Sequence, residues 1–369
     1  MLLTVSIAAC RDDHECADSP RDNWLRLFKE MPGFSILDLC PIPERGTAAD
    51  AFRHSLDLAQ HAEAWGYQRF WLAEHHNMPG IASAATSVVI AHVAAGTKTI
   101  RVGAGGVMLP NHSPLIIAEQ FGTLATLFPD RIDLGLGRAP GTDPLTARAL
   151  RRDLLTGADH FPQDVIELQS YLGPLQPGQR VRAVPGSGLN VPIWLLGSSL
   201  FSAQLAAQLG LPFAFASHFA PADLMEAIHL YRNQFKRSEH LPRPYVMAAI
   251  NVIAADTDSE ARRLFTSLQQ AFVNLRRGTP GRLPPPIEDI SAYASPIEIT
   301  MIDQALSCSV MGSPESVIHG LRQFLTRTQV DELMITANIY DHAARLKSFG
   351  MIAKMRDLIS ADEPSNARS

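Results

Sequence analysis

From residue 34 onward, short continuous apolar runs alternate with longer stretches in which apolar residues recur at helical spacing. Residues 35–42 (SILDLCPI) are an apolar run that ends at prolines, which is typical of a buried parallel strand. Residues 48–66 then repeat apolar side chains at helical intervals and end at Gly66. The same change recurs and predicts eight strands, over residues 35–42, 69–74, 100–109, 131–136, 191–196, 212–217, 245–254 and 332–337.

A predicted helix follows each predicted strand, and this order decides the fold class. The helices are expected over residues 48–66, 82–96, 114–127, within 139–190, over 198–209 and 221–237, from 256–260 onward, and over 343–359. Strict alternation of strands and helices is typical of a parallel sheet. Eight such units predict an α/β fold, a single (β/α)8 TIM barrel with insertions, with a doubly wound open sheet as the alternative.

Three regions do not fit the alternation. Residues 1–33 are charged at their C-terminal side and have no clear period, so they are predicted to be an extension. Residues 139–190 include a Gly/Pro-rich stretch, and residues 276–313 contain three consecutive prolines. Long insertions in barrel enzymes often cover the active-site face, and a merely disordered loop is the alternative. The expected division is therefore a barrel at 34–360 with these two insertions, and a tail at 361–369.

Composition limits the partners. The 369 residues include 32 Lys and Arg against 37 Asp and Glu, for a net charge of −5, and 46% are apolar. These values exclude a disordered chain, and the acidic balance gives no basic surface for nucleic acid or an anionic membrane. No apolar run reaches the ~18 residues that a membrane-spanning helix needs.

The cysteines favour a reducing compartment. Cys10, Cys16, Cys40 and Cys308 are few and have no CxxC spacing, which argues against a disulfide framework or a structural zinc site. Residues 7–10 (IAAC) look like a lipoprotein cleavage box, but no Lys or Arg precedes them, as a signal peptide requires. The chain is therefore predicted to be cytoplasmic.

Polar residues and glycines follow the predicted strands, at the end where a barrel enzyme has its active site. This ring consists of Glu74, His75, His76, Gly105, Gly106, Asn111, His112, Gly137, Arg138, Gly197, Ser198, Ser199 and His218. Adjacent histidines point in different directions and no HExxH motif is present, so no metal is predicted. The pair Gly105 and Gly106 permits close backbone approach, or is only a bulge.

The turn Gly197-Ser198-Ser199 is a candidate phosphate site. It lies between a predicted strand and a predicted helix, where backbone N–H groups and the positive helix terminus can bind an anion. Arg138 ends another strand and can bind the same anion through its guanidinium, although serine is also a common N-cap. No GxGxxG follows the first strand and no P-loop motif is present. Flavin mononucleotide (FMN), with a phosphate tail and a flat ring, would fit these features.

Four segments together resemble the bacterial luciferase-like flavin-dependent monooxygenases. They are residues 71–77 (WLAEHHN), 102–114 (VGAGGVMLPNHSP), 118–121 (AEQF) and 131–138 (RIDLGLGR). The similarity is strongest over residues 34–140 and continues to residue 355. It implies a TIM barrel that binds reduced FMN non-covalently and reacts it with O2 through a peroxyflavin to oxidise a small organic substrate.

The resemblance also implies roles for single residues. His75 matches the first histidine of the family's EHH motif, a catalytic acid/base whose near-neutral pKa suits proton transfer. Gly105 and Gly106 match the position of a non-prolyl cis peptide under the flavin. Arg138 and the serine turn match the groups that bind the flavin phosphate. The complete set of expected cofactor-binding residues is Glu74, Gly105, Gly106, Arg138, Gly197, Ser198 and Ser199.

Two departures separate this chain from the light-emitting luciferases. Gly137 stands where they have a reactive cysteine, and Ser198 stands where they have an acidic residue, so light emission is not expected. The function predicted is an FMN-dependent monooxygenase acting on paired donors. Because the chain has no nicotinamide-binding motif, a separate flavin reductase is expected to supply reduced FMN.

Other functions stay open at this point. An F420-dependent oxidoreductase and a non-catalytic flavin-binding barrel are the alternatives. A barrel hydrolase with paired carboxylates is disfavoured, because Glu74 is the one carboxylate in the predicted ring. Relatives commonly dimerise through early barrel helices, so a homodimer through residues 82–96 and 114–127 is expected, with core packing of their apolar faces as the alternative.

Overall fold

The computed structural model describes residues 32–139, 144–150, 159–239 and 241–360. Most of the predicted extension at residues 1–33 and all of the predicted tail at 361–369 lie outside these residues. The first strand begins at Gly33, one residue before the expected start of the barrel. Within the described chain, no helix is both long enough and apolar enough to cross a membrane.

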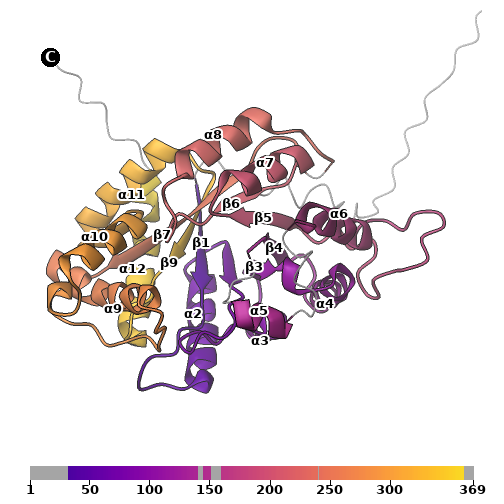
Figure 1. Cartoon of the computed structure of the whole chain (residues 1–369). Coiled ribbons are helices and arrows are strands. Elements are labelled where there is room, and N and C mark those ends of the chain that lie inside the picture. The colour runs from indigo at the N-terminus through magenta and orange to yellow at the C-terminus, as the bar shows by residue number, and fades with distance from the viewer. Residues whose placement is uncertain (1–31, 140–143, 151–158, 240, 361–369) are drawn as a thin grey trace, which may run out of the picture.

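Eight parallel strands close into a barrel, which confirms the predicted TIM-barrel fold (Figure 1). Their order around the barrel is β1-β2-β3-β4-β5-β6-β7-β9, and pairing of β9 with both β7 and β1 closes the ring. The strands are β1 Gly33–Asp38, β2 Arg69–Leu72, β3 Arg101–Met108, β4 Ile132–Gly137, β5 Ile193–Gly197, β6 Phe213–Phe215, β7 Val246–Ala254 and β9 Glu332–Thr336.

One further strand, β8 (Ser309–Gly312), lies outside the barrel and was not expected from the sequence. It falls within the predicted insertion at residues 276–313. The strand β7 is nine residues long, so residues 252–254 extend beyond β9 and pair with β8, while Asn251 pairs with both β8 and β9. A strand of four residues that is mostly half-buried has no alternation long enough to be recognised.

Helices surround the barrel (Figure 1). They are α2 Ala48–Ala64, α3 Thr86–Ala95, α4 Pro114–Leu127, α5 Pro144–Leu150, α6 Phe161–Leu172, α7 Leu200–Leu209, α8 Leu224–Gln234, α9 Asp258–Arg276, α10 Pro296–Ala305, α11 Pro314–Thr328 and α12 His342–Ser360. Two short 3-10 helices, η1 Leu109–Asn111 and η2 Ile290–Ala292, complete the elements. Local sequence sets the helix starts: Thr47 and Asp50 form a capping box at α2, and prolines open α4, α6 and α11.

The Gly/Pro-rich part of the first predicted insertion and the second predicted insertion lie at different ends of the barrel. Helix α6 is the helix of the fourth βα unit, and the Gly/Pro-rich residues 173–190 follow it and lead into β5, so they start at the N-terminal ends of the strands. In the second insertion, the Leu283 N–H donates to Ile42 and the Leu283 carbonyl accepts from Glu44, each at 2.9 Å. Residues 42 and 44 follow β1, so this insertion reaches the C-terminal ends, where barrel enzymes bind their substrates.

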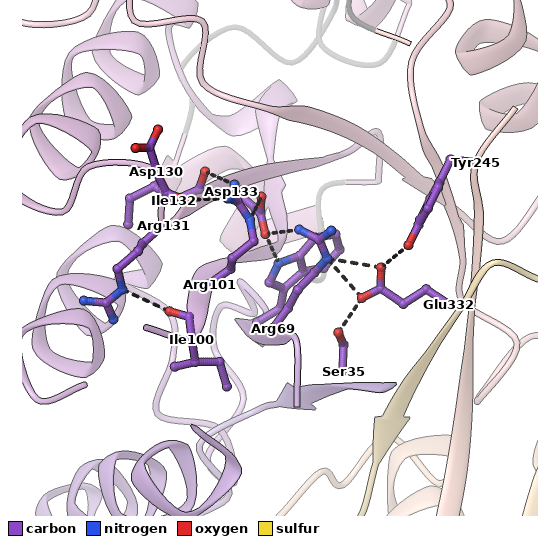
Figure 2. Close-up of polar contacts among 11 residues, drawn as sticks. Ser35, Arg69, Ile100, Arg101, Asp130, Arg131, Ile132, Asp133, Tyr245 and Glu332 are labelled. Atoms are coloured by element: carbon purple, nitrogen blue, oxygen red, sulfur yellow. Dashed lines mark hydrogen bonds and ion pairs between the residues drawn. The ribbon is translucent and has the colours of Figure 1, made fainter. Parts of the chain in front are cut away.

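The interior of the barrel is filled and closed at its N-terminal end. Trp194 packs edge-on against both Trp71 and Tyr245 in the inner apolar cluster. Below them, Arg69 Nε donates to both carboxylate oxygens of Glu332, at 3.0 and 3.2 Å, and Arg69 Nη1 lies 2.7 Å from Asp133 Oδ2 (Figure 2). The packed rings and the ion pairs close this end, so the mouth of the barrel lies at the other end.

Candidate active site

Glu74 joins the loops that follow β2 and β3. One carboxylate oxygen accepts from His76 Nε2 at 2.7 Å and from His112 Nε2 at 2.8 Å, and the other accepts the Met108 N–H at 2.9 Å. Burial alone would raise the pKa of Glu74, but these hydrogen bonds outweigh it and hold the pKa below its ordinary value. Glu74 is therefore an ionised, buried carboxylate with partners for both oxygens, and it fixes the chain on either side of His75.

The same cluster contains the residue types that bind metal ions. Ligand atoms of Glu74, His76 and His112 all lie within 4.8 Å of one another. Both imidazoles, however, already share hydrogen bonds with the carboxylate, which accounts for the arrangement without an ion. The expectation that the site uses no metal stays a prediction.

His75 is directed toward the mouth of the barrel. Trp71 and Ala73 belong to the inner cluster, and His75 follows Ala73 by two residues, just beyond the end of β2. Its Nδ1 atom is shielded from solvent and has no hydrogen-bond partner in the part of the chain that the structure describes. Burial lowers the pKa of His75 despite the nearby charge of Glu74, so the imidazole is neutral at pH 7. A neutral imidazole at a strand end, with its Nδ1 atom free of partners among the described residues, is suited to proton transfer.

Two glycines form the adjacent part of the mouth. The peptide bond between Gly105 and Gly106 is cis, as the family resemblance implied. A Cβ at position 105 would lie 2.8 Å from Leu37 Cδ1, and one at position 106 would lie 2.8 Å from the Gly135 carbonyl oxygen. Because neither position has room for a side chain, bare backbone lines the mouth beside His75.

Arg138 and the serine turn lie next to each other. The Arg138 guanidinium carbon lies 4.1 Å from the ring centroid of Phe201, in the first turn of α7. Ser199 is the N-cap of this helix in extended conformation, yet its side chain makes no capping hydrogen bond. A Cβ on Gly197 would lie 2.3 Å from Ser202 Oγ, so the tight turn before α7 requires glycine. The arrangement brings a cation, a hydroxyl and a helix N-terminus together, as an anion site requires.

The structure gives His112 and His218 contacts and burial that the sequence does not predict. His112 was noted at a strand end, but its hydrogen bond to Glu74 depends on η1, which no motif predicts. His218 was noted after the sixth strand, and the structure shows that its Nδ1 atom is buried without a partner in the described residues. Burial, with the nearby charge of His75, lowers the pKa of His218 to about 3.

A model of one protein family, described as luciferase-like monooxygenase, matches residues 33–332. The chain belongs to this family. A luciferase-like monooxygenase of Escherichia coli is 59% identical over 324 residues, which cover 88% of this chain and 97% of that protein. The N-acetyl-S-alkylcysteine monooxygenase of Bacillus subtilis is 38% identical over 261 residues, which cover 67% of this chain and 75% of that protein.

Solved structures of the luciferase-like fold also resemble this chain. The crystal structure of apo-MsnO8 has 34% sequence identity and a TM-score of 0.79, covering 89% of this chain and 99% of that chain. The FMN complex of the oxygenating constituent of 3,6-diketocamphane monooxygenase from Pseudomonas putida has 19% identity and a TM-score of 0.66, covering 88% and 97%. An F420-dependent secondary alcohol dehydrogenase has 13% identity and a TM-score of 0.63, covering 90% and 100%. At these identities the last two show a shared fold alone.

Proposed function

We propose that this chain is an FMN-dependent monooxygenase that oxygenates a small organic substrate. The observation that carries the proposal is the position of Arg138 beside the start of α7, where the Ser199 hydroxyl makes no capping hydrogen bond. These groups would hold the FMN phosphate, with Ser198 and the Gly197 turn completing the site. Reduced FMN, once bound, supplies the electrons that activate O2. Membership of a monooxygenase family and likeness to a named monooxygenase support the reaction class.

The residues around the glycine pair have distinct tasks in this proposal. Gly105 and Gly106 give a flat ligand access to the strand backbone, because neither position has room for a side chain. His75 accepts or returns a proton at an imidazole nitrogen of the mouth, which its neutral state allows. Glu74 positions His75 through the hydrogen bonds to His76 and Met108.

The proposal includes partners. A separate flavin reductase would provide reduced FMN in the cytoplasm, because the sequence has no nicotinamide-binding motif of its own. A homodimer would form through α3 and α4. The exposed fractions of Val88 on α3 and Ile116 on α4, 67% and 50%, support an apolar contact there.

Anaerobic titration with reduced FMN, and in parallel with reduced F420, tests the cofactor. We expect reduced FMN to bind saturably and reduced F420 not to bind. The FMN complex should then consume O2 when it is mixed with air-saturated buffer. Saturable binding of F420 but not FMN would make the chain an F420-dependent oxidoreductase. FMN binding without any change in O2 consumption relative to free reduced FMN would identify a non-catalytic flavin-binding barrel.

A further inference from the structure

His218 lies on the wall of the mouth opposite His75. It follows β6, and three strands separate β6 from β2 in either direction around the barrel. The Asn251 side chain donates to the His218 carbonyl oxygen at 2.7 Å, and the ring of Phe219 packs edge-on at a centroid distance of 4.7 Å. The hydrogen bond fixes the His218 backbone and Phe219 packs against its ring, while the Nδ1 atom has no partner within the described chain. A buried polar atom without a partner requires an explanation, and a bound ligand supplies one.

The mouth divides into two unlike halves. Strands β2 to β5 carry the groups assigned above to the cofactor: His75, the glycine pair, Arg138 and the serine turn. The other half is formed by β6, β7, β9 and β1, whose inward positions near the mouth are Ala216, Asn251, Thr336 and Leu39. No charged side chain stands at these four positions. Leu39 packs, half-exposed, on the inner cluster that contains Met334, so the floor of this half is apolar.

His218 is thus a polar side chain at the edge of an apolar floor, and it is neutral at pH 7. Burial, together with the charge of a protonated His75, lowers the pKa of His218 to about 3. A neutral imidazole can donate or accept a hydrogen bond, but it does not offset the cost of burying a carboxylate or a phosphate. This half of the mouth is therefore suited to an uncharged ligand.

Building on the proposed monooxygenase function, we propose that His218 orients the substrate. The substrate class is an uncharged molecule whose apolar body lies on Leu39 and Met334 and whose single polar group hydrogen-bonds His218 Nδ1. His218 is then a catalytic residue in the sense that it contacts the substrate, while His75 on the opposite wall handles the proton.

Three probes, each with one aromatic ring, differ in charge and in hydrogen-bonding ability. Acetophenone is a neutral hydrogen-bond acceptor, ethylbenzene lacks a polar group, and benzoate is an anion. Each is titrated into the FMN-loaded protein, with dissociation constants and the imidazole resonances of His218 as readouts. We expect acetophenone to shift these resonances and to bind more tightly than benzoate. Tighter binding of benzoate, or unmoved His218 resonances with acetophenone, would overturn the inference.

Variants isolate the hydrogen bond. His218→Phe keeps a ring but removes Nδ1, and should weaken acetophenone binding about fivefold while leaving ethylbenzene binding unchanged. His218→Asn retains an amide near the position of Nδ1 and should recover most of the loss. His229→Phe is the matched control, because His229 is exposed on α8, the helix that follows β6. Equal acetophenone affinity in His218→Phe and the wild type would show that His218 makes no such contact.

Measurement of FMN affinity on the same samples separates this inference from the proposed function. His218→Phe should bind FMN within about twofold of the wild type, since the cofactor groups lie on the other half. A tenfold loss of FMN affinity would place His218 in the cofactor site. That result would overturn this inference but not the proposed monooxygenase function. If the wild-type protein does not bind FMN, the proposed function fails, whereas titration of the cofactor-free protein with the same probes still decides the role of His218.

Discussion

The two ends of the barrel use polar residues in opposite ways. At the N-terminal end, Glu332 accepts from Arg69 Nε, from the Tyr245 hydroxyl at 2.8 Å and from the Ser35 hydroxyl (Figure 2). At the C-terminal end, His75 and His218 each leave Nδ1 without a partner in the described residues. Both ends contain buried polar groups, but in the first the charged groups bond to one another, and Trp194 Nε1 is the buried atom there without a partner among the described residues.

The difference separates stability from function. In the closed end, the charges of Arg69 and Arg101 lower the pKa of Asp133 although its burial acts in the other direction, so the ion pairs hold their charges at neutral pH. In the mouth, burial lowers the pKa of His75 and of His218, so both imidazoles are neutral at pH 7. Atoms left unpaired in the mouth reduce stability and are available to a ligand. Substitutions at the N-terminal end should therefore change the free energy of unfolding, and substitutions in the mouth should change the reaction rate or the affinity for FMN.

The largest expected effect is on stability, from Arg69→Met. The substitution removes the cation that bonds to both Glu332 and Asp133. Asp133 retains Arg101, but Glu332 keeps only hydroxyl partners among the groups described here, and a buried carboxylate remains uncompensated. The free energy of unfolding should fall by about 3–5 kcal/mol, as measured by urea denaturation.

Arg53→Met is the control for this change. Arg53 pairs with Asp50 on the surface of α2, and its side chain is 69% exposed, so less than about 1 kcal/mol should be lost. Equal losses in the two variants would mean that the closed end does not depend on its ion pairs.

The fold of the closed end and the mouth could be predicted to different extents. Apolar runs such as residues 35–42 and helices such as Pro114–Leu127 were recognisable because burial on the sheet and helical spacing leave local patterns. The network of Arg69 and Glu332 could not be recognised, because the two residues are 263 positions apart and meet only when β9 pairs with β1. The extra strand β8 was also missed, since its pairing depends on where β9 ends.

The candidate site shows the same limit. Strand ends located His75, Arg138 and the serine turn, because a parallel barrel brings all strand ends to one face. The contact of Arg138 with Phe201 confirms that Arg138 and the start of α7 are neighbours. The proposed role of His218 in orienting the substrate could not be predicted from the sequence. It depends on the burial of Nδ1 and on the lack of a partner within the described residues, and both are tertiary properties.

The second effect is on the reaction rate, from His75→Asn. Loss of the proton-transferring imidazole should slow reoxidation of enzyme-bound reduced FMN by O2 about a hundredfold, measured by stopped-flow absorbance. FMN affinity should stay within about twofold. Because the pKa of His75 lies below its ordinary value, the wild-type rate should fall only as the pH drops below about 6.5, and the variant should lose this dependence.

His92→Asn is the matched control, because His92 is exposed on α3, the helix that follows β2. Its rate and pH profile should equal those of the wild type. An unchanged profile in His75→Asn would assign the proton transfer to another group.

The smallest expected effect is on cofactor affinity, from Arg138→Ala. The guanidinium stacks on Phe201 beside the N-terminus of α7, where it can form a charge-assisted hydrogen bond to the FMN phosphate. Removing it should weaken FMN binding about tenfold, while riboflavin, which lacks the phosphate, should bind equally to variant and wild type. Arg180→Ala, at an exposed arginine in the segment between α6 and β5, should change neither affinity. If riboflavin binding falls as much as FMN binding, Arg138 stabilises the structure of the mouth and does not bind the phosphate. Arg138 would then be a structural residue at the end of the barrel that we assign to ligand binding.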